Sequence, residues 1–110
     1  MILRESSVLR IYCKATEKSR GAPLYRAIVE AARGRRLAGA SVFPVELGYG
    51  SHRQLHDIAS EYTSFDIPVV VEIVDAPEKI KAFMPDLERM VGDGLITLER
   101  AEVLLYRPNR

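Results

Sequence analysis

The sequence predicts an α+β protein with the ferredoxin-like βαββαβ order, in which two helices cover one face of an antiparallel sheet. Two segments with helical spacing of apolar residues, 23–34 and 76–91, are separated by two runs with strand character. A further alternating run precedes the first helix, and another follows the second helix. We expect the 110 residues to form a single domain spanning 1–110.

The first strand is predicted over Ser7–Lys14, where apolar and more polar residues alternate. Leu9, Ile11 and Cys13 share one face, so we expect Cys13 to be a buried thiol rather than a reactive one. Because Cys13 is the only cysteine, the sequence excludes an internal disulfide and a cysteine-based zinc cluster, and it fits a reducing compartment. The polar KATEKSRGA that follows is predicted to be a loop.

The first helix is predicted to begin at Pro23, because proline is favoured at the first helical position. Apolar residues then recur with helical spacing from Leu24 to Ala32, which predicts one narrow buried stripe. Gly34 is expected to close the helix, and Arg33, Arg35 and Arg36 suit the negative end of the helix dipole. This arginine cluster is short and has no aromatic residue beside it, so we expect no nucleic-acid partner.

Two strands are predicted between the helices. In Gly39–Leu47, Pro44 cannot donate a hydrogen bond to a neighbouring strand, which favours an edge position or a bulge. A loop follows, with a short helical piece expected around Gln54–Ser60. Ile67–Asp75 is the most apolar run of the chain and rich in β-branched residues, so it is predicted to be a central strand. Glu72 in this strand is expected at an exposed or interface position.

The second helix is expected to follow Asp75 as its N-cap, with Pro77 in its first turn and Glu78 at the capping-box position. Pro85 is an interior proline that is expected to kink the helix. The apolar face comprises Ile80, Phe83, Met84, Leu87, Met90 and Val91. Gly92-Asp93-Gly94 is predicted to end the helix, and Leu95–Tyr106 to form the last strand before the RPNR tail.

Composition excludes several classes of protein. The net charge of +1 gives no bulk electrostatic argument for nucleic-acid binding. The N-terminus lacks the apolar core of a signal peptide, because Arg4, Glu5 and Arg10 interrupt it. No apolar run reaches the roughly 18 residues that a membrane span needs. A cytoplasmic location is therefore expected.

Five segments together resemble the PII-like proteins of unknown function, relatives of the nitrogen-regulatory PII signalling proteins. They are PLYRAIVEAA (residues 23–32), LAGASV (37–42), DIPVVVEIVD (66–75), EKI (78–80) and MVGDGLITLERAEVLLY (90–106). Their order and spacing cover nearly the whole chain, although no one segment is diagnostic alone. The sequence departs from the family where an Arg-Gly pair is usual near the start of the second strand, because Phe43-Pro44 or Pro44-Val45 stands there.

The resemblance implies a homotrimer that binds an adenine nucleotide, AMP, ADP or ATP, in clefts between subunits. It also implies a regulatory protein without enzymatic activity or a required cofactor, whose long loop switches on binding and docks on a partner, a membrane transporter or an enzyme. Three elements correspond to the family's nucleotide site. They are the loop base Gly48, Tyr49 and Gly50, the turn Gly92, Asp93, Gly94 and Leu95, and the C-terminal Arg107 and Arg110.

Taken alone, each of these elements also has a structural interpretation. The glycines at 92 and 94 could converge backbone N–H groups on a phosphate through positive φ, or could only stop a helix. Tyr49 between two glycines could stack on a base, or the segment could be a hinge. Arg107 and Arg110 could pair with phosphates, or could form a solubilising tail.

A second hypothesis is a divalent-metal protein resembling the copper-tolerance trimers of similar fold. His52 and His56 would share one face if their segment were helical, and Asp57 could add a third ligand for zinc or copper. Two exposed histidines in a loop are the structural alternative, and no metal site is assigned from the sequence. A trimer without any small ligand is a third, weaker hypothesis.

Overall fold

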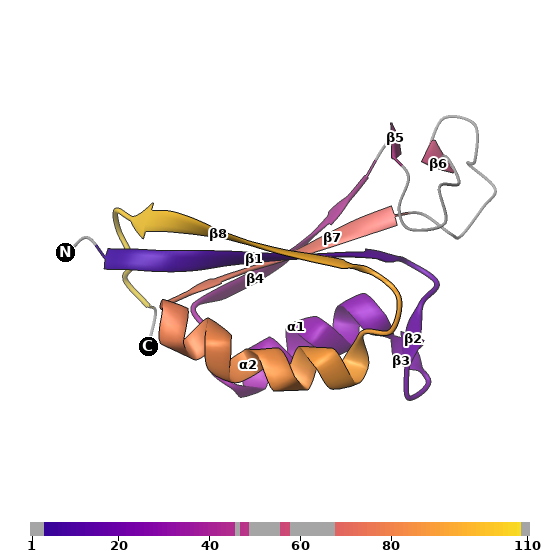
Figure 1. The fold of residues 1–110 in the computed structure, drawn as a ribbon, viewed down its shortest axis with the longest axis horizontal. Coiled ribbons are helices and arrows are strands. Elements are labelled where there is room, and N and C mark those ends of the chain that lie inside the picture. Colours follow the sequence, from indigo (N-terminus) through magenta and orange to yellow (C-terminus); the bar gives the residue numbers. More distant parts are fainter. Residues whose placement is uncertain (1–3, 46, 49–55, 58–67, 109–110) are drawn as a thin grey trace.

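The computed structural model describes residues 4–45, 47–48, 56–57 and 68–108. Its main layer is a four-stranded antiparallel sheet with the strand order β4-β7-β1-β8. Two helices lie next to each other on one face of this sheet (Figure 1). The bounds are β1 (Arg4–Lys14), α1 (Leu24–Gly34), β4 (Gly39–Pro44), β7 (Pro68–Asp75), α2 (Pro77–Met90) and β8 (Leu95–Val103). The predicted ferredoxin-like α+β architecture is confirmed.

The core lies between the two helices and the sheet. The larger of its fully buried side chains include Phe83 of α2, Leu9 and Ile11 of β1, and Leu24 of α1. Cys13 is buried in the same cluster, as its position in the alternating pattern predicts. The other members are Ile28, Ala32, Val69, Val71, Ile73, Ile80 and Leu87. In the described part of the chain, no helix is long and apolar enough to cross a membrane.

Two small hairpins accompany the main sheet. Strands β2 (Lys18–Ser19) and β3 (Ala22–Pro23) pair where a loop was expected up to Ala22. Pro23, predicted to be the first helical residue, lies in β3 and caps α1, which begins at Leu24. Arg20 and Gly21 connect them with φ values of 49° and 85°, which suits the two-residue turns that join antiparallel strands. Strands β5 (Leu47–Gly48) and β6 (His56–Asp57) form the second hairpin.

The predicted helical piece around Gln54–Ser60 is wrong at residues 56–57. His56 pairs with Gly48 and Asp57 pairs with Leu47, so this stretch is extended by strand pairing that a local pattern does not reveal. The rest of the predicted piece lies outside the described residues.

The strand ends differ from the prediction where pairing decides them. β1 begins at Arg4 rather than Ser7, because Arg4 pairs with Val103 of β8. β8 ends at that same pair instead of continuing to Tyr106. Strand β4 lies at the edge of the sheet and ends at Pro44, which pairs with Val69 of the interior strand β7. The edge position expected from this proline is confirmed.

Asp75 is not the N-cap of α2, because Ala76 occupies that position. The Asp75 carboxylate accepts hydrogen bonds from the backbone N–H groups of Ala38, at 2.8 Å, and Ala76, at 2.6 Å. It therefore ties the end of β7 to the residue that precedes β4. Pro77 lies in the first turn of α2, and Pro85 lies inside the helix, as the sequence predicts.

The end of α1 is closed by an arginine in the left-handed conformation. Gly34 is the last helical residue, and the positive φ of 57° belongs to Arg36. The N–H of Arg36 donates to the carbonyl of Arg33 at 2.9 Å, and the N–H of Leu37 donates to that of Ala32 at 3.1 Å. These two bonds form a Schellman motif, whose left-handed position is usually glycine. The expectation that Gly34 supplies the helix stop is wrong by two residues.

Replacing Arg36 by glycine is expected to raise the free energy of unfolding. The left-handed conformation costs an L-residue roughly 1–2 kcal/mol, and glycine removes that cost. Glycine also makes the unfolded chain more flexible, which offsets part of the gain. We expect a net gain of about 1 kcal/mol in urea denaturation at constant protein concentration. Arg33→Gly, inside the last turn of α1, is the matched control and should lower stability. A lower urea midpoint for Arg36→Gly would contradict this account.

Stability is expected to fall as the pH rises from 9 to 11, with a contribution from Cys13. Burial, and secondarily the nearby Glu17 carboxylate, raise the pKa of the Cys13 thiol from 9.0 to about 11. In that interval the unfolded thiol loses its proton while the folded thiol keeps it, so deprotonation favours unfolding. Urea midpoints of the wild type and Cys13→Ala, measured across this interval, should converge as the pH rises. Parallel curves would show that this thiol keeps an ordinary pKa.

Candidate functional site

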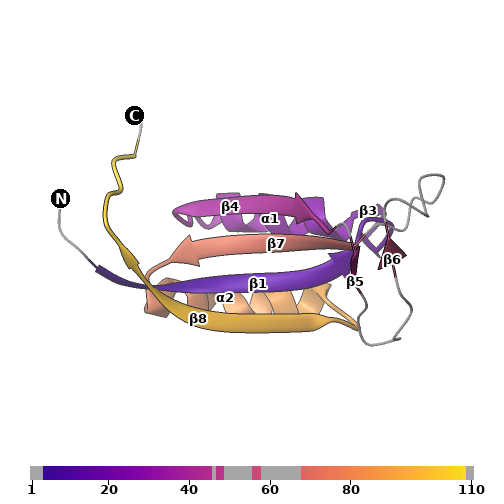
Figure 2. The ribbon, with the colours of Figure 1, turned by 90° about the horizontal axis from the view of Figure 1, so that it is seen from above.

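The face of the sheet opposite the helices carries a row of apolar side chains across all four strands. In β1, Tyr12 lies between Ile11 and Cys13 and therefore points away from the core that they enter. Tyr12 pairs with Val70 of β7 and Leu95 of β8, and Val70 pairs with Phe43 of β4. We call these four side chains the apolar row; three are well exposed, Phe43 at 49%, Tyr12 at 38% and Leu95 at 57%. Figure 2 looks onto this face, with the helices behind the strands.

An ion-pair network occupies the middle of the same face. The Arg10 Nε lies 3.0 Å from Glu72 Oε2, and its guanidinium also donates to Glu99. Hydrogen bonds to Glu99 and Glu72 raise the pKa of Arg10 above its ordinary value. The three residues come from neighbouring strands of the sheet. Glu72 is thus half-buried on the uncovered face, in line with the exposed or interface position predicted for it.

The turn formed by Gly92, Asp93, Gly94 and Leu95 leads from α2 into β8 at one end of this face. Val91 ends α2 in an extended conformation, and neither glycine has a left-handed φ. The anion nest expected from positive φ is therefore not formed in this conformation. A Cβ on Gly94 would meet the Tyr12 carbonyl oxygen at 3.3 Å, which explains a glycine there by close approach to β1. A Cβ on Gly92 would enter open space.

The base of the long loop lies at the same end of the sheet as this turn (Figure 1). The Val45 N–H donates to the Pro68 carbonyl at 2.9 Å, and Pro68 pairs with Lys14 near the end of β1. The chain then enters β5, where Gly48 pairs with His56. Tyr49 and Gly50 lie outside the described residues. Two of the three predicted nucleotide-binding elements therefore begin at the same end of the sheet.

Arg107 lies at the opposite end of the sheet. β8 starts with Leu95 opposite Tyr12 and ends with Val103 opposite Arg4. Its nine residues make the strand about 27 Å long. Arg107 is exposed in the segment that follows, close to the C-terminus marked in Figures 1 and 2. Arg110 lies outside the described residues. One chain does not bring the C-terminal arginine to the glycine turn.

The metal hypothesis loses its helical premise. His56 and Asp57 belong to strand β6, so His52 and His56 do not share the face of a continuous helix. His52 itself lies outside the described residues. Within the described ranges, no group of three or more His, Cys, Asp or Glu side chains could hold a metal ion.

Sequence reasoning did not single out the apolar row or the Arg10 network as parts of a site. The signal for the row is present, because Tyr12, Val70 and Phe43 are apolar residues at positions that alternate with core residues. A sheet that is solvated on one face would carry polar residues there. The network could not be found in this way, since it depends on the registers of two strand pairs.

Comparison with known proteins places the chain in a family. Residues 6–103 match the DUF190 family, which is described as "Uncharacterized ACR". A UPF0166 protein of Aquifex aeolicus is 38% identical over 100 residues, which cover 91% of this chain and 94% of that protein. A UPF0166 protein of Methanocaldococcus jannaschii is 28% identical over 90% of this chain and 92% of that protein.

Solved structures with similar folds are PII-like proteins. A PII-like signaling protein of Thermus thermophilus has a TM-score of 0.69 and 17% identity, covering 94% of this chain and 93% of that one. CPII of Thiomonas intermedia, a nitrogen regulatory PII-like protein solved with ADP, AMP and bicarbonate, has a TM-score of 0.63 and 15% identity, covering 93% and 91%. At these identities the similarity shows the fold alone. The chain belongs to the DUF190 (UPF0166) family and has the fold of PII-like proteins.

Proposed function

We propose that this chain is a PII-like regulatory protein that assembles as a homotrimer and binds an adenine nucleotide between its subunits. The uncovered apolar row is the observation that carries this proposal. Phe43, Tyr12 and Leu95 lie exposed on the sheet face opposite the one that packs against the helices. Burial of apolar surface contributes roughly 25 cal/mol per Å², so covering this row with other copies of the chain favours association.

The charged centre of the face is compatible with burial in such an assembly. A buried cation without a partner would oppose association strongly. Arg10 already has carboxylate partners from its own chain, Glu72 and Glu99. The network therefore does not leave an uncompensated guanidinium when the sheets pack against each other.

A nucleotide site shared by two subunits agrees with the positions of the predicted residues. The turn Gly92–Leu95 and the loop base Gly48–Gly50 are proposed to bind the nucleotide from one subunit. Arg107 of a neighbouring subunit would supply positive charge to the phosphates, because the length of β8 separates it from the turn in its own chain. Arg110 is proposed to assist it. Structures of CPII with ADP and AMP support adenine nucleotides as the ligand class.

The proposed activity is binding without a chemical step. A nucleotide that prefers one arrangement of the long loop between β5 and β7 would shift the population of that arrangement. A membrane transporter or an enzyme would then recognise the loop. Which of AMP, ADP and ATP produces the shift is decided by their relative affinities for the two arrangements.

Tyr12→Glu is expected to convert the trimer to single chains. The carboxylate would lie within the apolar row and would have to be buried on assembly, whereas it stays in water on an isolated chain. Size-exclusion chromatography with light scattering should give three times the chain mass for the wild type and one chain mass for the variant. Ala82→Glu, exposed on α2, is the matched control and should remain trimeric. A wild-type protein that elutes as a single chain would refute the trimer.

Gly92→Ala is expected to weaken nucleotide binding without affecting folding. The added methyl group enters open space in the chain, but it would obstruct a phosphate that approaches the backbone of the turn. Losing one hydrogen bond to a charged group corresponds to an affinity loss of roughly tenfold. Calorimetric titrations with AMP, ADP and ATP test this. The control is Gly34→Ala at the end of α1, where an added Cβ also meets no atom within 4 Å. Flat titrations of the wild type with all three nucleotides would remove the proposal.

A further inference from the structure

We propose that the helical side of the molecule carries a separate docking surface for membranes rich in anionic lipid. The surface consists of Arg33, Arg35 and Arg36 at the end of α1 and Arg89 of α2, and we call it the arginine patch. This inference concerns the side of the sheet opposite the apolar row. It does not depend on the nucleotide site.

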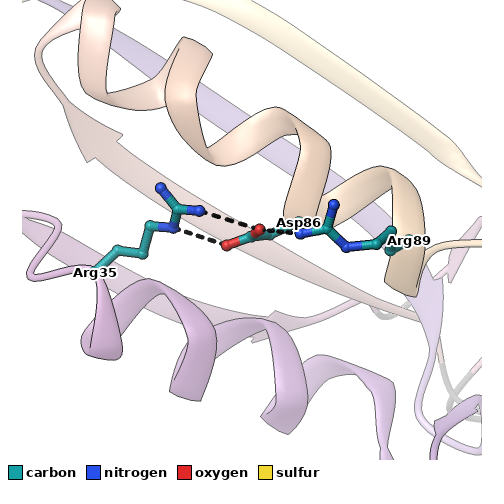
Figure 3. A network of polar contacts seen from close by, with 3 residues as sticks. All are labelled: Arg35, Asp86 and Arg89. Carbon is teal, nitrogen blue, oxygen red and sulfur yellow. Dashed lines mark hydrogen bonds and ion pairs between the residues drawn. The ribbon is translucent and has the colours of Figure 1, made fainter.

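The patch carries excess positive charge that the described residues do not neutralise. Asp86 of α2 is the carboxylate that its arginines share (Figure 3). Arg35 binds it through two hydrogen bonds, Nε to Oδ2 at 2.8 Å and a terminal nitrogen to Oδ1 at 3.2 Å, and Arg89 donates to the same Oδ1. Among the described residues, Arg33 and Arg36 form no ion pair, although both are exposed. Two of the four guanidinium groups thus share one carboxylate, and the other two have no ion-pair partner among the described residues.

The ion pair orders the patch without exhausting its donors. Each guanidinium has five N–H groups, and Arg35 uses its fork on Asp86 while Arg89 uses one donor there. Both keep N–H groups for an incoming anion, and the shared carboxylate fixes the end of α1 against α2. Guanidinium groups bind phosphate oxygens well in this geometry.

The contrast with the sheet face supports a functional role for this charge. On the sheet, Arg10 is flanked by Glu72 and Glu99, and Arg100 lies 3.4 Å from Glu5. There, carboxylates match or outnumber the arginines that they contact. The region 24–36, which contains α1, instead carries Arg26 and three patch arginines against Glu30 as its one acidic residue.

Arg36 adds a second observation, because it occupies a backbone position that disfavours it. Its φ of 57° is one that glycine adopts at no steric cost, whereas arginine is strained there. The Schellman motif at the end of α1 holds Arg36 in this conformation. Here the side chain contributes charge next to Arg33 and Arg35.

The composition of the patch favours lipid head groups over a protein partner. Protein interfaces centre on buried aromatic and apolar anchors. The large hydrophobic residues that are exposed lie in the strands or after β8, and none belongs to α1 or α2 in the described part of the chain. A surface of cations without such anchors matches the phosphates of anionic lipids, which attract basic residues mainly by charge.

The test is cosedimentation of the full chain with vesicles of phosphatidylglycerol and phosphatidylcholine, and with vesicles of phosphatidylcholine alone. We expect binding to the anionic vesicles at low salt, its loss at high salt, and no binding to the neutral vesicles. Arg33→Glu with Arg36→Glu should lower the vesicle affinity about 30-fold or more, because each basic residue contributes a several-fold factor. Arg33→Gln with Arg36→Gln should fall between this variant and the wild type.

The matched control is Lys18→Glu with Arg20→Glu, which changes the net charge equally in the β2–β3 hairpin at the other end of α1. It should keep most of the vesicle affinity. Circular dichroism of each variant establishes that it is folded. Equal losses in the two charge-reversed variants would overturn the proposal, as would no binding of the wild type to anionic vesicles. Binding to an RNA oligonucleotide but not to vesicles would also overturn it.

Discussion

The structure depends on a sheet that carries apolar side chains on both faces while the chain provides helices for only one of them. Strands β1 and β7 are interior, and their alternate side chains fill the core under Phe83. The remaining side chains of the same strands place Tyr12 and Val70 on the other face. Exposure of this second face to water is unfavourable, because its apolar surface stays hydrated instead of being buried under a packed layer. In the assembly that we propose, self-association would cover this face and would create a boundary between subunits where a ligand could bind.

The distribution of charge separates two surfaces with different roles. On the sheet face, Arg10 is compensated within its own chain, which suits a surface that becomes buried. On the helical side, Arg35 and Arg89 share Asp86, and further arginines stay exposed, which suits a surface that remains in water. Assembly through the sheets would leave the helical layers facing outward. A trimer would then present three copies of the arginine patch, and weak contacts with a surface would add through multivalency.

Hydrophobic periodicity was sufficient to predict the order of the main strands and helices, because it follows directly from which side chains are buried. Cys13 was placed correctly for the same reason, and Pro44 because a proline cannot donate a hydrogen bond to a second neighbouring strand. Errors arose where long-range pairing decides the structure. Arg4 extends β1 through its partner in β8, and His56 is extended through Gly48. Arg36, rather than Gly34, takes the left-handed position, since the helix ends where its hydrogen bonds do.

The candidate site was less predictable than the fold because its predicted residues are divided between segments at opposite ends of the sheet. The sequence pattern identifies the glycines at 92 and 94, but it does not show that Gly94 is needed for contact with the backbone of β1. It also cannot show that Arg107 lies at the far end of the sheet, since that follows from the β1–β8 register. Both facts change the interpretation of the site. The contact with β1 gives Gly94 a structural reason to be glycine. The position of Arg107 at the far end of the sheet is the reason why we propose that it acts from a second copy of the chain.

Hydroxyl-radical footprinting with mass spectrometry is the most direct measurement of whether the second sheet face is covered. In an isolated chain, the exposed fractions of 38% for Tyr12 and 49% for Phe43 would make both aromatic rings reactive. Our account predicts strong protection of both rings in the native protein. Modification of Tyr12 and Phe43 at rates that follow their single-chain exposure would contradict it.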